Sequence, residues 1–157
     1  MASERLGTIL QEWYKLSLGE RTHVDNAFFK FICLWVAFNA MYSFEFPNET
    51  HDAKKVEKYS LLQDVIDKHG LLVSSNKEYK TALEYLKTHS LKGRGVKELS
   101  DINNFNMVLT FIYKIRCNLF HGEKYESNTR DKRLVENAYL ILLNVIKDRL
   151  ESKFQEK

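Results

Sequence analysis

Residues 28–42 read Phe-Phe-Lys-Phe-Ile-Cys-Leu-Trp-Val-Ala-Phe-Asn-Ala-Met-Tyr, which is the most apolar run of the chain. Large apolar side chains recur there at helical spacing, and Val36 and Ala37 widen the stripe that they form. A helix that is apolar over most of its circumference is usually a central helix, covered by neighbours on several sides. The run therefore predicts a core helix over about residues 24–44, with Asp25 or Asn26 as its N-cap and Pro47 beyond its end.

Five further amphipathic segments flank this run. Apolar residues recur at helical spacing in each, which predicts helices over about residues 3–18, 56–69, 76–89, 104–120 and 130–154. Ser3 is the expected N-cap of the first helix and Gly19 its end, while Gly70 is expected to separate the two segments on either side of it. The polar residues 48–56 and the basic stretch 92–97, with its two glycines, predict loops.

Glycine and proline are scarce, since the 157 residues include six Gly and one Pro. A β-sandwich or barrel needs frequent turn residues, so this scarcity favours long helices joined by few loops. The chain is 44% hydrophobic and 29% charged, a composition typical of a globular protein with a real core. We therefore predict an all-α fold, a bundle of about five to six helices that forms one domain over residues 1–157.

The charge and the cysteines of the chain bear on two expectations, a nucleic-acid partner and a location in the cytoplasm. The net charge of +3 is the small excess of 24 basic over 21 acidic residues, which favours a nucleic-acid partner only weakly. Cys33 and Cys117 lie among apolar neighbours, which predicts reduced, buried thiols and no disulfide. Glu4 and Glu12 interrupt the N-terminal segment, which argues against a signal peptide, and the apolar run 31–44 is too short to span a bilayer. We expect a soluble, cytoplasmic protein that does not enter a membrane.

Metal and cofactor sites find no support in the sequence. The five histidines show no i, i+4 pairing around a carboxylate, and no Cys/His ligand spacing occurs. Glycine-rich phosphate motifs and nucleophile elbows are also absent. We therefore expect neither a metal ion nor a cofactor.

The stretch Ile115-Arg-Cys-Asn-Leu-Phe-His-Gly122 is the strongest candidate for chemistry. Cleavage of RNA without a metal requires a proton taken from the ribose 2′-OH, a proton given to the leaving 5′ oxygen, and positive charge beside the phosphate. Histidine is well suited to the proton transfers near neutral pH. Arginine offers a planar fork of donors that matches phosphate oxygens and keeps its charge. Arg116 and His121 are therefore the candidate catalytic residues.

The spacing of this pair has a consequence for the site. Five helical steps place the two side chains roughly 140° apart around the helix and roughly 7 Å apart along its axis. One helix alone does not direct both groups at one phosphate. A two-fold pairing of this helix with its copy would bring two Arg and two His into one groove, so the spacing favours a homodimer with a composite site.

The pattern Arg-x4-His at the end of a penultimate helix, continued as Leu119-Phe-His-Gly122, resembles the signature of the HEPN superfamily of α-helical domains. The aromatic segment from Leu34 to Tyr42 also resembles the second helix of HEPN proteins with a similar motif. The two blocks cover about a fifth of the chain, and the order of helices agrees over most of the rest.

This resemblance implies a metal-independent endoribonuclease, active as a homodimer, of the kind found in toxin–antitoxin systems, phage defence or RNA processing. Its substrate would be RNA, and its products would carry 2′,3′-cyclic phosphate and 5′-OH ends. An antitoxin or a nucleotidyltransferase is a possible partner, although the Tyr that such a transferase modifies in some HEPN toxins is Glu123 here. The family often has a polar residue directly after the Arg, whereas Cys117 stands there and Asn118 follows it.

Four further residues are assigned to the same activity. Asn118 is the candidate that orients the phosphate or the histidine. Lys124, just past the motif, and the loop residues Arg94 and Lys97 are candidates for contacts with RNA phosphates. A solvated loop is the usual alternative for Arg94 and Lys97.

Structural alternatives stand beside each of these assignments. Arg116 is equally a solvated helix residue in the simplest interpretation, and His121 a helix C-cap. Asn39 is interpreted as a buried amide that fixes helix register, and the aromatic residues around it as core and not as a base-stacking surface. For the whole chain, the alternatives are a catalytically inactive HEPN domain that binds RNA or nucleotide, and a helical protein-interaction module.

Overall fold

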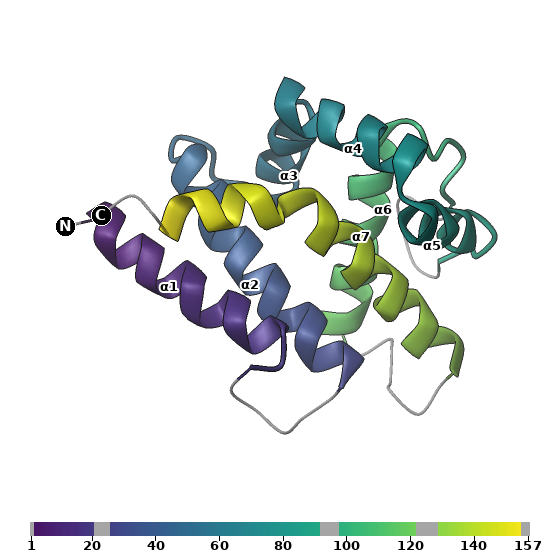
Figure 1. The fold of residues 1–157 in the computed structure, drawn as a ribbon, viewed down its shortest axis with the longest axis horizontal. Helices are drawn as coiled ribbons and strands as arrows, with labels where there is room; N and C mark the ends of the chain where they lie inside the picture. Colours follow the sequence, from purple (N-terminus) through teal and green to yellow (C-terminus); the bar gives the residue numbers. More distant parts are fainter. Residues whose placement is uncertain (1, 21–25, 92–97, 122–128, 155–157) are drawn as a thin grey trace.

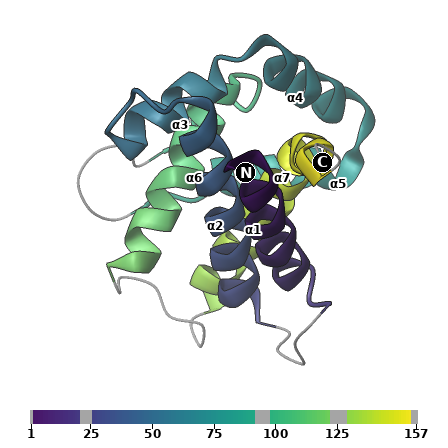
Figure 2. The same ribbon diagram turned by 90° about the vertical axis from the view of Figure 1, so that its left-hand side faces the viewer.

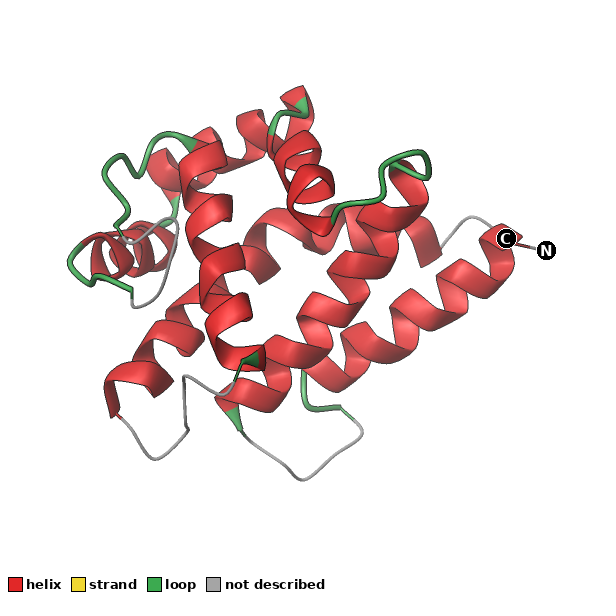
Figure 3. Cartoon of the chain, turned by 180° about the vertical axis from the view of Figure 1, so that it is seen from behind, coloured by secondary structure: helices red, strands yellow, loops and turns green. Residues whose placement is uncertain are grey.

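The computed structural model describes residues 2–20, 26–91, 98–121 and 129–154. Within these ranges the chain forms helices joined by turns and loops, with no strand (Figure 3). The helices, in chain order, are α1 (Ala2–Ser17), α2 (Ala27–Glu45), α3 (Asp52–Ser60), α4 (Gln63–Ser75), α5 (Lys77–Lys87), α6 (Phe105–Phe120) and α7 (Thr129–Phe154). Figure 1 shows α1 and α2 side by side and α7 running across the bundle. The all-α prediction is confirmed for the described residues.

Helix α2 is the central helix, as the apolar run predicts. It packs against both α1 and α7, and it lies between α1 and α6 (Figure 2). The rings of Trp35, Phe38 and Tyr42 are buried and meet edge to face, with Phe38 at 5.2 Å from Trp35 and 4.9 Å from Tyr42 between centroids. Such pairs add to the stabilisation that burial of apolar surface provides. These aromatic side chains therefore belong to the core and do not form a base-stacking surface.

Among the described helices, α2 alone is long and apolar enough to cross a membrane by length and composition. Eight of its residues are buried against the rest of the bundle, as expected of a core helix. The prediction that the apolar run is too short to span a bilayer counted only residues 31–44, whereas α2 contains 19 residues. Its packing, and not its length, identifies it as a core helix.

Asparagine side chains begin three of the helices. The Oδ1 atoms of Asn26, Asn76 and Asn104 accept hydrogen bonds from backbone N–H groups three residues later, at 3.1, 3.0 and 3.2 Å. Each bond satisfies one of the donors that a helix N-terminus leaves unpaired. Asn26 is thus the cap of α2, whereas Ser3 lies inside α1 and its assignment as an N-cap is wrong.

Gly19 ends α1 in the left-handed conformation that the sequence predicts, with φ at +78°. The N–H of Gly19 bonds to the carbonyl of Leu16, and the N–H of Glu20 bonds to that of Lys15. This pair of bonds is the Schellman motif, in which the residue at the left-handed position is usually glycine because a Cβ atom is unfavourable there.

Replacing this glycine is expected to destabilise the fold. Gly19→Ala should lower the free energy of unfolding by roughly 1 kcal/mol, the cost of holding a Cβ in the left-handed region. Gly70→Ala is the matched control, since Gly70 lies in α4 with no atom near the added Cβ, and this change should raise stability by roughly 0.5–1 kcal/mol. Urea unfolding measures both. A shift of both variants in the same direction would contradict this account of Gly19.

The helix count differs from the prediction because residues 56–69 form parts of two helices. The inward residues of α3 are Val56, Tyr59 and Ser60, and those of α4 are Val65, His69 and Leu72. At about 100° per residue, Val56 and Val65 would point to opposite sides of a continuous helix. The chain bends at Leu61 and Leu62 so that both stripes reach the core. The described residues thus form seven helices and not five or six.

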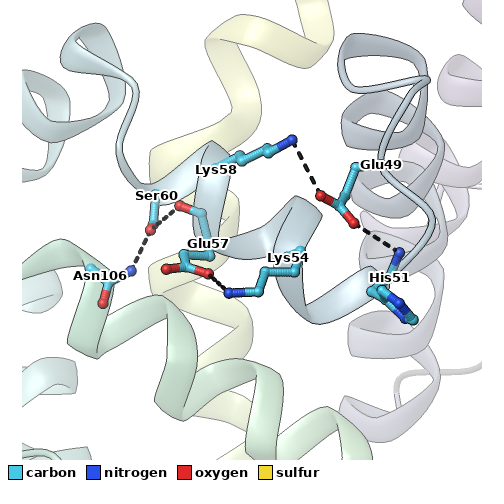
Figure 4. Close-up of polar contacts among 7 residues, drawn as sticks. All are labelled: Glu49, His51, Lys54, Glu57, Lys58, Ser60 and Asn106. Atoms are coloured by element: carbon cyan, nitrogen blue, oxygen red, sulfur yellow. Dashed lines mark hydrogen bonds and ion pairs between the residues drawn. The ribbon is translucent and has the colours of Figure 1, made fainter.

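Two neighbouring predictions are also corrected. Gly70 does not separate helices, because α4 continues to Ser75 and an isolated glycine costs a helix only about 1 kcal/mol. The predicted loop 48–56 ends early, since α3 begins at Asp52. Figure 4 shows why the chain turns into α3 there: the carboxylate of Glu49 accepts the backbone N–H of His51 at 3.3 Å and pairs with Lys58 at 3.2 Å.

Arg149 of α7 contacts residues of three other helices. Its guanidinium bonds to Glu45 at the end of α2, with an N–O distance of 2.5 Å, and to both oxygens of Asp64 in the first turn of α4. It also lies 5.5 Å from the ring centroid of Tyr59 in α3. Arg149 lowers the pKa of the Asp64 carboxyl through these hydrogen bonds. Because the planar guanidinium donates to the carboxylates of Asp64 and Glu45 at the same time, it holds α4 against the central helix α2.

A buried histidine joins α4 to α5 and to the segment that precedes α6. His69 is 1% exposed; its Nε2 donates to the carbonyl of Ile102 at 2.8 Å, and its Nδ1 lies 2.6 Å from the hydroxyl of Tyr79. Because a carbonyl only accepts, the proton of the neutral ring is assigned to Nε2, and Tyr79 donates to Nδ1. Burial lowers the pKa of His69, so the folded protein holds a neutral ring.

This histidine should make stability depend on pH. In the unfolded chain the imidazole titrates near pH 6.5, whereas in the folded chain its pKa is lower. The contribution of His69 to the free energy of unfolding is therefore fully present above about pH 6.5. It falls as the pH drops towards the folded-state pKa, because the unfolded chain then binds a proton that the folded chain does not. As the pH is lowered below about 6.5, the urea concentration at the unfolding midpoint should decrease in the wild type. It should decrease equally in the control His51→Gln, which changes an exposed histidine. Equal pH dependence in His69→Gln would contradict the assignment.

Candidate functional site

Helix α6 carries the Arg-x4-His motif at its C-terminal end. Asn104 caps its start, and seven residues along it are buried. The helix extends to Phe120, and His121 is the C-cap, whose backbone N–H bonds to the carbonyl of Cys117 at 3.0 Å. Regular helical geometry therefore continues across Arg116 and reaches the residue before His121.

The guanidinium of Arg116 lies among aromatic rings. Its Cζ is 4.6 Å from the ring centroid of Phe120, 5.7 Å from that of Tyr113 and 5.9 Å from that of Trp35. All three distances fall within the range of cation–π attraction. Tyr113 and Phe120 are the residues three before and four after Arg116 on α6, so they flank it on one helical face. The rings thus hold the cation at the junction of α2 and α6.

Hydrogen bonding around this cation is incomplete. The Nε of Arg116 and the Nε1 of Trp35 are buried and have no hydrogen-bond partner among the residues that the structure describes. Nor is a carboxylate paired with Arg116 in those ranges; Nη1 contacts the sulfur of Cys117 at 3.9 Å. A buried donor without a partner costs about 1–3 kcal/mol. The positive charge is therefore held in place by packing and is not neutralised by an ion pair there.

Two tyrosine hydroxyls share this environment. Burial raises the pKa of Tyr42, the Asp52 carboxylate adds to the shift, and Arg116 opposes it. Burial, followed by the neighbouring Cys117, raises the pKa of Tyr113. Both hydroxyls thus stay protonated and neutral near pH 7. Asn39 is half-buried and not buried as predicted, and its amide donates to the Tyr42 hydroxyl, three residues along α2, at 2.5 Å.

His121 has a different environment from Arg116. It is exposed to solvent at the end of α6, whereas the Nε of Arg116 is buried. The structure records no contact between these two described side chains, which is consistent with their separation of roughly 140° around the helix. A single copy of α6 therefore does not bring the two candidate catalytic groups together.

The remaining sequence-predicted residues fall into two groups. Asn118 is only 2% exposed, so its amide faces the interior of the bundle, one helical turn before His121. Arg94, Lys97 and Lys124 lie outside the described residues. Cys33 is buried and Cys117 half-buried, and both are free thiols. No group of three or more metal-binding side chains gathers in the described part of the chain.

The sequence interpretation did not identify Tyr113 and Phe120 as the rings that lie against the guanidinium of Arg116. The signal was present, because residues three before and four after an arginine on a helix lie beside it. It was overlooked because Tyr113 and Phe120 read as ordinary residues of an amphipathic helix. Phe120 is 48% exposed, so its ring contacts the guanidinium and also faces solvent.

Comparison of the chain with protein-family models, with curated proteins and with solved structures gives no match.

Proposed function

We propose that this protein is a metal-independent endoribonuclease of the HEPN type, with Arg116 and His121 as its catalytic pair. The observation that carries the proposal is the state of Arg116: a cation fixed by three rings, with an unpartnered Nε and no carboxylate paired with it among the described residues. A positive charge held in this way suits an anion that arrives from outside, such as a phosphodiester.

His121 supplies the proton transfer in this proposal. Its side chain is exposed at the helix end, where a substrate can reach it. It removes the proton of the ribose 2′-OH or protonates the leaving 5′ oxygen, as an imidazole does well near neutral pH. The 2′ oxygen attacks the phosphorus and the bond to the 5′ oxygen breaks, which leaves a 2′,3′-cyclic phosphate and a 5′-OH. Arg116 stabilises the additional negative charge on the phosphate oxygens during the attack.

Asn118 is a positioning residue in this scheme and does not touch the substrate. Its burial in α6 leaves its amide inside the bundle, so we assign it to fixing the last turn of the helix, on which His121 stands. Contact with the phosphate is left to Arg116 and to the basic residues beyond the described ranges, Arg94, Lys97 and Lys124.

A second copy of the chain completes the site in the proposal. The separation of Arg116 and His121 on one helix means that a shared phosphate needs groups from two helices. An isologous dimer along α6 would supply Arg from one copy and His from the other. Cytoplasmic location, a role in toxin–antitoxin or phage-defence systems, and an antitoxin or nucleotidyltransferase partner remain parts of this proposal.

Cleavage of a mixed-sequence RNA in excess EDTA tests the activity. We expect the purified protein to cut this RNA and to leave 2′,3′-cyclic phosphate and 5′-OH ends, which end-specific enzymes and mass spectrometry identify. Cleavage that stops in EDTA, or that leaves 5′-phosphate ends, would contradict the proposed chemistry. RNA binding without cleavage would support instead a catalytically inactive binding domain.

A further inference from the structure

The surface that connects the two proposed catalytic residues on one copy of α6 is aromatic. At about 100° per residue, Phe120 lies roughly 40° and His121 roughly 140° from Arg116 around the helix axis. Tyr113 and Cys117 lie on the same arc, at roughly 60° and 100°. Phe120 and Tyr113 therefore lie beside the guanidinium, on the side of the helix that leads towards His121.

Phe120 is the exposed member of this arc. The Arg116 Cζ lies 4.6 Å from its ring centroid, so the guanidinium occupies one face of the ring. The residue is nevertheless 48% exposed, whereas Trp35, whose ring centroid lies 5.9 Å from the same guanidinium, is 2% exposed. A large apolar ring left open to water beside a cation is a cost to the free protein, which a flat ligand stacked on it would recover.

We propose that Phe120 is a stacking platform for an unpaired nucleobase next to the scissile phosphate. The inference rests on the proposed ribonuclease function and assigns a base-binding residue to its site. A nucleobase is flat and offers a π face whatever its identity, which suits a ring without hydrogen-bonding groups. The phosphate attached to the same nucleotide then meets Arg116, whose charge the ring holds in place.

The exclusion of duplex RNA follows from the same geometry. In an A-form duplex, each base is stacked between its neighbours and paired across the helix, so no face is free to cover Phe120. A base in a single strand, loop or bulge has a free face. Binding through Phe120 therefore discriminates between paired and unpaired RNA without discriminating strongly between bases.

Binding measured in a cleavage-deficient background separates this inference from the activity. The probe is a short fluorescent RNA of mixed sequence, either single-stranded or annealed to its complement, bound in EDTA by the His121→Ala protein. Adding Phe120→Leu, which removes the ring but keeps an apolar side chain, should weaken single-strand binding by at least about fivefold, since base–aromatic stacking accounts for roughly 5- to 150-fold in affinity. Phe120→Trp should restore it. Duplex binding should change little in either variant.

Phe44 provides the matched control, because it is 44% exposed at the far end of α2. Phe44→Leu should leave single-strand binding unchanged. Unaltered single-strand binding by Phe120→Leu, equal losses for both forms of RNA, or no binding by the parent protein would each overturn the inference. A change of solution mass in Phe120→Leu would overturn it as well, because Phe120 would then belong to a contact between copies.

The activity and the platform can fail separately. If the wild type never cleaves RNA but Phe120→Leu loses single-strand binding, the platform stands and the nuclease proposal fails. If the wild type cleaves and Phe120→Leu cleaves and binds equally well, the nuclease proposal stands and the platform is wrong.

Discussion

Replacing His121 by alanine is expected to reduce RNA cleavage by roughly a hundredfold or more, because general acid–base catalysis contributes about 10²- to 10⁴-fold. Arg116→Ala should cause a loss of similar size by removing the charge that faces the phosphate. Arg116→Lys should recover little activity, since an ammonium lacks the planar fork that packs on the rings and matches phosphate oxygens. Initial rates on one fluorescent RNA in excess EDTA measure all three variants.

Control variants show whether a loss of cleavage is specific to Arg116 and His121. His51→Ala changes another exposed histidine at a helix end, and Arg133→Ala changes an exposed arginine of α7, so both should cut at the wild-type rate. Thermal unfolding of each variant shows whether the protein remains folded. Equal cleavage by the wild type, His121→Ala and Arg116→Ala would rule out this pair as the catalytic residues.

Phe38→Ala is expected to lower the free energy of unfolding by about 3–5 kcal/mol, the usual cost of truncating a buried phenylalanine. Phe38 has no exposed surface, and its ring lies 5.2, 4.9 and 4.9 Å from those of Trp35, Tyr42 and Tyr59. Its removal would leave a cavity where α2 meets α3, and the surrounding rings cannot all move to fill it.

Urea unfolding, followed by far-ultraviolet circular dichroism, measures this loss. Phe44→Ala is the control, because Phe44 is 44% exposed on the same helix and its truncation should cost far less. Similar losses for the two variants would mean that α2 is not packed in solution as it is in this structure.

The sequence predicted those parts of the fold that depend on local signals. The apolar run of α2, its cap at Asn26 (one of the two residues proposed) and Gly19 each act within a few residues, so their pattern is visible in the chain itself. The caps at Asn76 and Asn104 carry the same kind of signal but were not predicted. The division between α3 and α4 was missed because it depends on where the core lies. Only the packed bundle shows that Val56 and Val65 must face the same interior from two directions.

The candidate site divides in the same way. Arg116 and His121 could be singled out because their side-chain chemistry and spacing are properties of the sequence. The rings around Arg116 could not all be, since Trp35 reaches it from α2, about 80 positions earlier in the chain. The burial of Asn118 likewise depends on which face of α6 meets the bundle. The motif thus names candidate residues, and tertiary packing decides which of them lie at the surface.

Mixing two inactive proteins tests the composite site most directly. Arg116→Ala and His121→Ala are unfolded together, refolded as a mixture and assayed on RNA in excess EDTA, beside each variant refolded alone and the wild type. If Arg from one copy works with His from the other, the mixture should cut RNA at a substantial fraction of the wild-type rate while each variant alone stays inactive. A mixture that forms dimers of both variants, yet is as inactive as its components beside an active wild type, would contradict a site built from two copies.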